Sequence, residues 1–360
     1  MSADSSVGAE FQQTPSADEC DGLLPVSLPT PVVASLPPNN CFGGTSDDGI
    51  GNYMLGYTVD DVVGHGHFAW QFFTIQQGSA VRIGDTGMFS DDAGVSVYSQ
   101  PSGFTLSAVS SPSGAASVSW YSHDGTFRAS STLTTFFMGG DYPFSAIGVD
   151  PSGGLAAVRT YKSTSEWVSE YQRFDKSGAV ESSWVRIDSG IARHQVVAVG
   201  VPLSGHALVL AAISYPSSMQ GRWLNRDGTP LTDWFAVAGS QFPEFHFLMD
   251  GSLVLRFGRD SDYIHRFEDG KAAVSPLPAW LQQRSGNQFF VVRGGKGYAS
   301  WGNEGPCPGK LEVLAASSGT SCGCVAVPGL LRTSSIGRDG SLIAPPEGSC
   351  QYNLYPQLLQ

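Results

Sequence analysis

The segment RFDKSGAVESSW (residues 173–184) reveals a repeat, because its pattern returns 50 residues later as WLNRDGTPLTDW (residues 223–234). In each copy a Ser-Gly or Asp-Gly dipeptide separates two runs of strand-forming residues. Such dipeptides supply the positive φ that tight hairpin turns require. The same turn recurs with spacings of 47, 53, 50, 42 and 49 residues, at Gly78, Gly125, Gly178, Gly228, Gly270 and Gly319. One structural unit therefore repeats about every 48 residues.

A second series of turns runs about half a repeat out of phase with the first. Its spacings are 50, 52, 46, 44 and 45 residues, and its glycines are Gly103, Gly153, Gly205, Gly251, Gly295 and Gly340. Each repeat thus contains two hairpins, or four antiparallel strands. Four strands in a unit of this length are typical of a β-propeller blade. With one further turn at Gly49 or Gly51, the sequence predicts an all-β, seven-bladed β-propeller of four-stranded antiparallel blades.

The two ends of the chain predict how the ring closes. The last repeat has room for a second and a third strand only, whereas CDGLLPVSL (residues 20–28) precedes the first repeat without a partner. Because a propeller ring must close on itself, we expect an N-terminal strand to join the C-terminal blade as its outer strand. Residues 1–18, rich in Ser and acidic residues, are predicted to be a flexible tether, and residues 19–360 a single propeller domain.

Aromatic residues recur just before the second turn of several repeats. They are Trp120 and Tyr121, Tyr171 and Phe174, Trp223, and Phe267. We expect them to pack between adjacent blades rather than to bind sugars.

The composition excludes nucleic acid as a partner and a membrane-spanning helix. The formal net charge of −12 repels a phosphate backbone, and no run of Lys or Arg offsets it, so nucleic acid is excluded as a partner. No apolar stretch approaches the roughly 18 to 20 residues that a membrane-spanning helix needs. We therefore expect no transmembrane segment.

The six cysteines predict disulfides and an oxidising compartment, because none forms a CxxC pair or has zinc-finger spacing. If the ends of the chain share a blade, Cys20 and Cys350 lie on neighbouring strands and are expected to bond. Cys307 is expected to pair with Cys322 or Cys324, and we predict Cys324. Cys41 would take the remaining cysteine. Reduced, buried cysteines, or a redox pair of Cys322 and Cys324, are the alternatives.

The chain resembles secreted bacterial β-propellers from about Cys20 to its C-terminus, and the turns FDKSGAVESSW and LNRDGTPLTDW look like repeats of large bacterial surface proteins. The stretch after Met1 lacks the basic and apolar regions of a signal peptide. We expect that a secretion signal has been removed and Met1 added. Residues 1–18 resemble the tether of a bacterial surface lipoprotein. The resemblance implies a secreted, periplasmic or cell-surface protein, either a monomer or part of an envelope assembly.

The connections between blades carry polar residues just before apolar inner strands, and these residues are expected to converge on the channel mouth. The candidate ligand-binding residues are Asp91, Asp92, Tyr142, Arg193, Arg284, Gln288 and Arg332. The candidate catalytic residues are His194 or His246 as general base and Glu244 or Asp141 as acid or metal ligand. A solvated rim of polar loops that binds nothing is the alternative.

A metal site is a further hypothesis. His65 and His67 are separated by one residue, so on an extended strand both side chains point to the same side and could hold a divalent metal with a carboxylate. Without a third ligand, such pairs are more often packing or surface histidines, and this is the alternative. No cofactor is otherwise expected, and a divalent metal is the alternative.

No two blade connections repeat the same polar residue, whereas a symmetric lectin would repeat its sugar-binding residues in every blade. The sequence therefore predicts a non-catalytic binding protein that recognises one asymmetric protein or glycan partner through its loops. The alternative is a hydrolase or lyase with a metal-assisted site at the channel mouth. The chain contains no GxSxG, HExxH or P-loop motif. A purely structural role in an envelope assembly is the third hypothesis.

Overall fold

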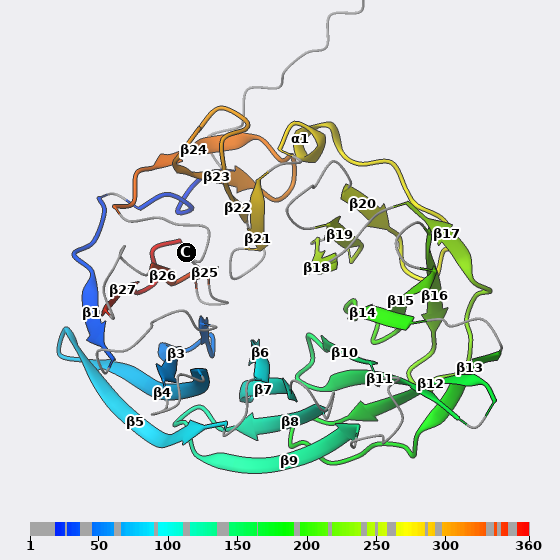
Figure 1. Cartoon of the computed structure of the whole chain (residues 1–360). Coiled ribbons are helices and arrows are strands. Elements are labelled where there is room, and N and C mark those ends of the chain that lie inside the picture. The colour runs from blue at the N-terminus through cyan, green and yellow to red at the C-terminus, as the bar shows by residue number, and fades with distance from the viewer. Residues whose placement is uncertain are drawn as a thin grey trace, which may run out of the picture.

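The computed structural model is a ring of antiparallel β-sheets arranged around a central axis (Figure 1). It describes residues 19–25, 27–36, 45–60, 66–89, 93–110, 116–134, 144–163, 165–190, 195–214, 218–238, 243–248, 251–257, 264–284, 287–291, 297–328, 335–336, 340–344 and 351–359. Within these residues six sheets have four strands and one has three. The prediction of an all-β, seven-bladed propeller is confirmed.

We number the blades along the chain. Blade 1 contains β2 (Thr45–Asp47), β3 (Asn52–Asp60), β4 (Gly66–Gln76) and β5 (Ser79–Met88). Blade 2 contains β6 (Ala93–Gln100), β7 (Gly103–Ser110), β8 (Ala116–Tyr121) and β9 (Phe127–Thr134). Blade 3 contains β10 (Phe144–Val149), β11 (Leu155–Lys162), β12 (Trp167–Phe174) and β13 (Val185–Gly190). Blade 4 contains β14 (Gln195–Gly200), β15 (Ala207–Ser214), β16 (Ser218–Leu224) and β17 (Phe235–Val237).

The remaining blades depart more from the repeat. Blade 5 contains β18 (Pro243–Phe247), β19 (Leu253–Phe257) and β20 (Ile264–Phe267). Blade 6 contains β21 (Gln288–Val291), β22 (Gly297–Trp301), β23 (Leu311–Ala315) and β24 (Ser321–Val325). Blade 7 contains β25 (Ser335–Ile336), β26 (Leu342–Ala344), β27 (Gln351–Tyr355) and β1 (Val32–Ser35).

Blade 5 replaces its fourth strand by a single bridge between Arg266 and Ser275. The helix α1 (Ala279–Gln282) follows and leads to blade 6 (Figure 1). It is the single helix in the part of the chain that the structure describes, and its four residues are far too few to cross a bilayer.

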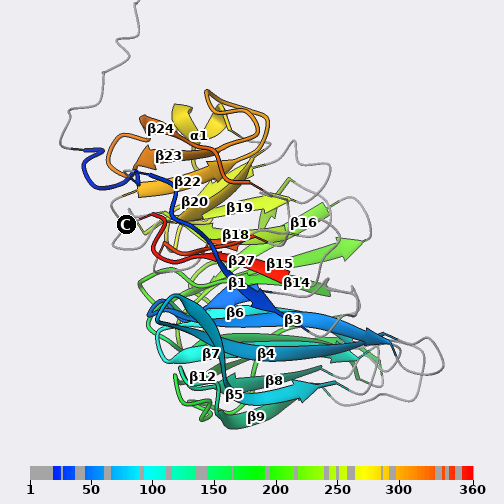
Figure 2. The same ribbon diagram turned by 90° about the vertical axis from the view of Figure 1, so that its left-hand side faces the viewer.

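An N-terminal strand completes blade 7. β1 is its outer strand and runs antiparallel to β27, with Val32 opposite Leu354 (Figure 2). The strand lies just beyond CDGLLPVSL, the segment in which the sequence placed it. That segment contacts blade 6 instead, because Leu23 is buried in the core that blades 6 and 7 share. On the other side of blade 7, the Tyr352 hydroxyl donates to the Gly56 carbonyl of blade 1 at 3.1 Å.

The turn glycines among the described residues have the positive φ that the repeat predicted, and the neighbouring blade adds a second constraint. Gly178 has φ +87°, and a Cβ on it would lie 2.7 Å from the Trp120 ring of blade 2. Gly125 has φ +77°, and its Cβ would lie 2.6 Å from the Phe72 ring of blade 1. Only glycine satisfies both the backbone conformation and the close approach.

The recurring aromatics pack between blades, as predicted. The ring centroids of Trp120 and Phe174, from blades 2 and 3, are 5.3 Å apart. The indole of Trp223 in blade 4 donates to the carbonyl of Lys271 in blade 5 at 3.0 Å. Phe267 packs against Phe235 with centroids 6.2 Å apart. These contacts bury the apolar face of each blade against the next one.

The alternating strand directions give the ring two faces, which Figure 2 shows edge-on. The hairpin turns that join first to second and third to fourth strands lie on one face, which we call the turn face. On the other face the second strands end and the third strands begin, and we call it the loop face. Described parts of the loop face include residues 302–310 and the end of the connection that leads into β21.

Candidate functional site

Most of the residues that the sequence singled out lie outside the described residues. These are His65, Asp91, Asp92, Asp141, Tyr142, Arg193, His194 and Arg332. Glu244 lies in β18 and Gln288 begins β21, where the structure describes the backbone course. The described side chains are those of His67, His246 and Arg284.

The two described histidines belong to different blades. His67 is half-buried in β4 of blade 1, where it is paired with Val59 of β3. His246 is half-buried in β18, the innermost strand of blade 5, opposite Val254. Among the residues that the structure describes, no three His, Cys, Asp or Glu side chains come together as a metal site.

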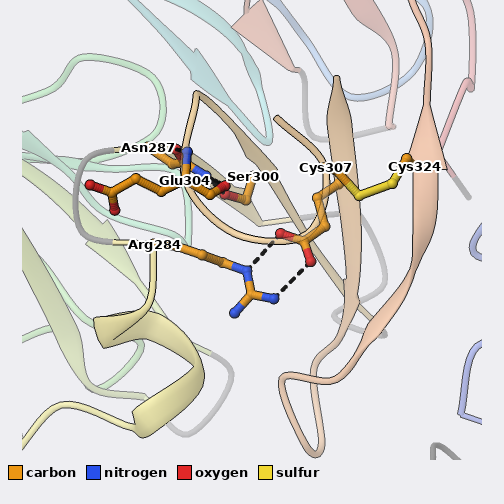
Figure 3. Close-up of a disulfide and its surroundings, with 7 residues drawn as sticks. Arg284, Asn287, Ser300, Glu304, Cys307 and Cys324 are labelled. Carbon is orange, nitrogen blue, oxygen red and sulfur yellow. Dashed lines mark hydrogen bonds and ion pairs between the residues drawn. A yellow bond between two sulfur atoms is a disulfide. The ribbon is translucent and has the colours of Figure 1, made fainter. Parts of the chain in front are cut away.

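Arg284 lies in the connection from α1 to β21 and forms a buried ion pair with Glu312 of β23 (Figure 3). Its Nε donates to Oε2 of Glu312 at 2.6 Å and its Nη2 to Oε1 at 2.7 Å, while Nη1 donates to the Trp280 carbonyl at 2.5 Å. The two side chains are 5% and 1% exposed. The guanidinium that the sequence proposed as a ligand contact is therefore bound to protein groups in this structure.

A loop of nine residues, 302–310, crosses the loop face beside this ion pair. Every residue of 303–310 is exposed except Cys307. The Asn287 side chain fixes the first part of the loop, since its Oδ1 accepts from the Glu304 amide at 3.1 Å and its Nδ2 donates to the Glu304 carbonyl at 3.0 Å. Nδ2 of Asn287 also donates to Ser300 Oγ at 3.0 Å, which holds the amide against β22.

A disulfide fixes the second part of the loop. Cys307 is bonded to Cys324 of β24, with Cα atoms 5.6 Å apart, so the prediction of this pair is confirmed (Figure 3). The Gly309 amide donates to the Gly302 carbonyl at 2.8 Å and closes the base of the loop. The loop is thus exposed in its side chains and constrained in its backbone. The sequence analysis missed Asn287, although the Gly and Pro residues around Cys307 were the available signal for a closed loop.

The second disulfide corrects the sequence prediction. Cys20 is bonded to Cys322 of β24, with Cα atoms 5.4 Å apart, and not to Cys350. The reason is that the N-terminal segment reaches blade 6 before it joins blade 7, so that Leu23 enters their shared core and Ser318 donates to Glu19 at 2.9 Å. Cys41 and Cys350 lie outside the described residues. Disulfides of this kind are typical of an oxidising compartment.

On the turn face, the ionisable groups of the described turns join one blade to the next. Asp150, in the first turn of blade 3, accepts from Arg226 in the second turn of blade 4 at 3.1 Å and also pairs with the fully buried Arg173. Burial alone raises the pKa of the Asp150 carboxyl, but hydrogen bonds from Ser152 and the charges of Arg173 and Arg226 outweigh it, so the pKa lies below its ordinary value. These groups stabilise the ring.

No protein-family model matches the chain, and no curated protein matches it in sequence. Several solved structures are similar to this chain over most of its length. The Dos1 propeller is 9% identical with a TM-score of 0.49 over 92% of this chain and 96% of that chain. The polysaccharide lyase Uly1 is 10% identical with a TM-score of 0.49, over 95% and 96%. The periplasmic gluconolactonase PpgL of Pseudomonas aeruginosa is 13% identical with a TM-score of 0.46, over 76% and 81%. Similarities of this size carry no argument about the chemistry or the function of this chain.

Proposed function

We propose that this propeller is a non-catalytic binding protein of the cell exterior or periplasm, and that it recognises a protein partner through its loop face. The observation that carries the proposal is loop 302–310, which is exposed and yet held by the Asn287 hydrogen bonds and the Cys307–Cys324 disulfide. A loop that is already ordered loses little conformational entropy when it binds. Rigid scaffolds that present such loops are a common basis for recognition.

Two further observations support a protein partner. Residues 302–310, GNEGPCPGK, contain no aromatic side chain on which a sugar ring could stack, whereas prolines and a short constrained backbone suit a protein surface. In addition, the blade connections differ in sequence from one blade to the next. A ring of unlike loops favours one asymmetric partner over a repeated ligand.

The same disulfides support the proposed localisation. Cys20–Cys322 and Cys307–Cys324 are both expected to persist in an oxidising compartment and to be reduced in a cytosol. We infer that the protein acts outside the cytoplasm, attached to the cell surface or free.

The experiment that tests the proposal uses two matched lysines. Lys310 is exposed on loop 302–310, and Lys176 is exposed on the turn face. Envelope proteins from the producing cell would be cross-linked to the full chain through a photoreactive residue placed at position 310 or 176. The cross-linked protein would then be purified and titrated with Lys310→Glu and Lys176→Glu.

We expect a discrete cross-linked protein from position 310 alone, a loss of affinity of at least tenfold for Lys310→Glu and less than a twofold change for Lys176→Glu. Equal effects at the two positions would contradict a loop-face interface. If the chain bound to a glycan array and no protein were cross-linked, the partner would be a glycan and not a protein. Turnover of ester or glycan substrates that a chelator abolishes would show that the protein is an enzyme, and would contradict the non-catalytic function.

A further inference from the structure

We propose that the Cys307–Cys324 disulfide is a reducible latch, which holds loop 302–310 closed over the Arg284–Glu312 ion pair until a dithiol opens it. The inference assigns a regulation to the loop and rests on the proposed binding function of that loop. Its evidence is the position of the loop over the ion pair and the difference between the two disulfides of β24.

The loop covers the ion pair directly. A Cβ on Gly305 would lie 3.3 Å from Oε2 of Glu312 and 3.4 Å from Cγ of Arg284, so the backbone at Gly305 lies against both partners. Because the loop covers it, this ion pair is almost inaccessible to solvent although it lies on the loop face. The Arg284 side chain is 5% exposed and the Glu312 side chain 1%. Figure 3 shows Arg284 with its ion pair, together with Glu304 and the Cys307–Cys324 disulfide. Opening of the loop would expose a guanidinium and a carboxylate that are now buried.

The two disulfides on β24 differ in their surroundings. Cys322 is half-buried and packs against the core shared by blades 6 and 7, and the Leu24 side chain covers the neighbouring Gly323 so closely that an added Cβ would lie 2.9 Å away. Cys324, two residues further on, is exposed. An attacking thiolate needs access to one sulfur of the bond only, and the exposed Cys324 offers that access although its partner Cys307 is buried. We therefore expect Cys307–Cys324 to be reduced first.

The chemistry is a thiol–disulfide exchange. One thiolate of the dithiol attacks Sγ of Cys324, forms a mixed disulfide and expels Cys307 as a thiolate, which takes up a proton. The second thiol of the dithiol then loses its proton and attacks the other sulfur of the same reagent molecule, which is bonded to Sγ of Cys324. Cys324 leaves as a thiolate and takes up a proton. The protein disulfide gains two electrons and two protons, and the dithiol becomes a disulfide.

Reduction removes the covalent attachment of the loop and leaves its hydrogen bonds, including the one from the Gly309 amide to the Gly302 carbonyl. The Asn287 bonds continue to hold Glu304, while residues 305–309 lose their covalent bond to β24. The segment over the ion pair is therefore the one that is released. The long-range Cys20–Cys322 bond is unaffected, so the blade keeps its connection to the N-terminal segment.

The test uses the full wild-type chain and dithiothreitol as the dithiol. Samples taken at increasing times would be alkylated with iodoacetamide and read at each cysteine by mass spectrometry, with hydrogen exchange measured in parallel. We expect Cys307 and Cys324 to be alkylated at least tenfold faster than Cys20 and Cys322. Amide exchange in residues 302–310 should rise at least tenfold, with β23 unchanged. Equal or earlier reduction of Cys20–Cys322, or unchanged exchange in the loop, would reject the latch.

Matched variants separate the latch from loss of folding and from the proposed function. Without reductant, the double variant Cys307→Ser, Cys324→Ser should exchange in the loop like the reduced wild type, whereas Cys20→Ser, Cys322→Ser should keep the loop protected. If Lys310→Glu abolishes partner binding while reduction leaves exchange unchanged, the latch fails and the binding function stands. If reduction opens the loop while Lys310→Glu binds normally, the binding function fails and the latch stands.

Discussion

Nδ1 of His123 lies 2.8 Å from Oδ2 of Asp48, across the boundary between blades 1 and 2. The same relationship recurs around the turn face: the first turn of one blade contacts the second turn of the next. Arg226 pairs with Asp150 between blades 3 and 4, and Asp269 with His206 between blades 4 and 5. Between blades 2 and 3 the contact is made by the Lys176 carbonyl, which accepts from Ser102 at 3.0 Å.

Replacement of His123 by Ala should lower the free energy of unfolding by about 1 kcal/mol, because the buried Asp48 carboxylate loses a hydrogen-bond partner from the next blade. Urea unfolding of the variant and the wild type measures this difference. Lys176→Ala is the matched control, since its turn contacts the neighbouring blade through a backbone carbonyl. If Lys176→Ala lowered the free energy of unfolding as much as His123→Ala, the contact between His123 and Asp48 would have no specific role in stability.

Gly178→Ala should destabilise the ring more than Gly251→Ala. Both glycines have a similar positive φ, +87° and +81°, so both substitutions carry the conformational cost of about 1 kcal/mol. A Cβ at position 251 meets nothing within 4 Å, whereas one at position 178 meets the Trp120 ring. We expect roughly 1 to 3 kcal/mol more at Gly178 from this overlap. Similar melting temperatures for the two variants would contradict the packing argument.

Asp150→Asn should be strongly destabilising, by roughly 3 to 5 kcal/mol at neutral pH, because it leaves the fully buried Arg173 without a counter-charge. Denaturant unfolding followed by tryptophan fluorescence measures the loss. Asp227→Asn, an exposed aspartate of the second turn in blade 4, is the control and should cost much less. A loss no larger than that of the control would mean that the Arg173–Asp150 pair contributes little to stability.

The same carboxyl predicts a dependence on pH. The pKa of Asp150 in the folded protein is lowered from its ordinary 3.8, so its charge stabilises the fold above that value and the contribution disappears as the pH falls through the lower folded pKa. The stability difference between wild type and Asp150→Asn should therefore shrink as the pH falls from about 5 towards about 1. A difference that stays constant over this range would contradict the prediction.

Removal of Cys20–Cys322 should cost more stability than removal of Cys307–Cys324. The two bonds join cysteines separated by 302 and 17 residues, and a longer closed loop restricts the unfolded chain more. The chain-entropy estimate is about 3 kcal/mol for a 15-residue loop and about 4.7 kcal/mol for a 100-residue loop. Unfolding of the two Cys-to-Ala double variants tests the order, and the reverse order would show that local strain or contacts dominate.

Tyr352 should ionise only in strong base. Burial raises the pKa of its hydroxyl to about 12, whereas a tyrosine in the unfolded chain ionises near 10, so this stabilising contribution is lost as the pH rises through that interval. Absorbance titration at alkaline pH, with Tyr352→Phe for comparison, should show one fewer late-titrating hydroxyl in the variant. Ionisation of Tyr352 near pH 10 would indicate that the contact between blades 7 and 1 is open to water.

The sequence predicted the parts of this structure that depend on local interactions. Turn glycines such as Gly178 and Gly228 require positive φ, and that requirement is visible in the chain itself as a Ser-Gly or Asp-Gly dipeptide. Apolar strands between such turns follow from alternation and composition. The number of blades and the packing of Trp120 and Phe174 between them were therefore predictable.

The site depended on contacts between residues far apart in the chain, which no local pattern encodes. Arg284 looked like a ligand-binding residue because a lone arginine before an inner strand gives no sign of Glu312, 28 residues later. Cys20 looked like a partner for Cys350 because both lie near the ends of a closed ring. Burial of the Leu23 side chain between blades 6 and 7 brings Cys20 close to Cys322, and this explains the observed disulfide.

The amino-acid sequence alone thus determined the repeating sheet and its sevenfold count, because hairpin geometry is a property of a few consecutive residues. Tertiary structure alone decided which cysteines bond, which arginine is neutralised and which loop is held rigid on the loop face. The physical reason is that these outcomes depend on which distant surfaces bury each other, and the free energy of that burial is set by the whole ring rather than by any one segment.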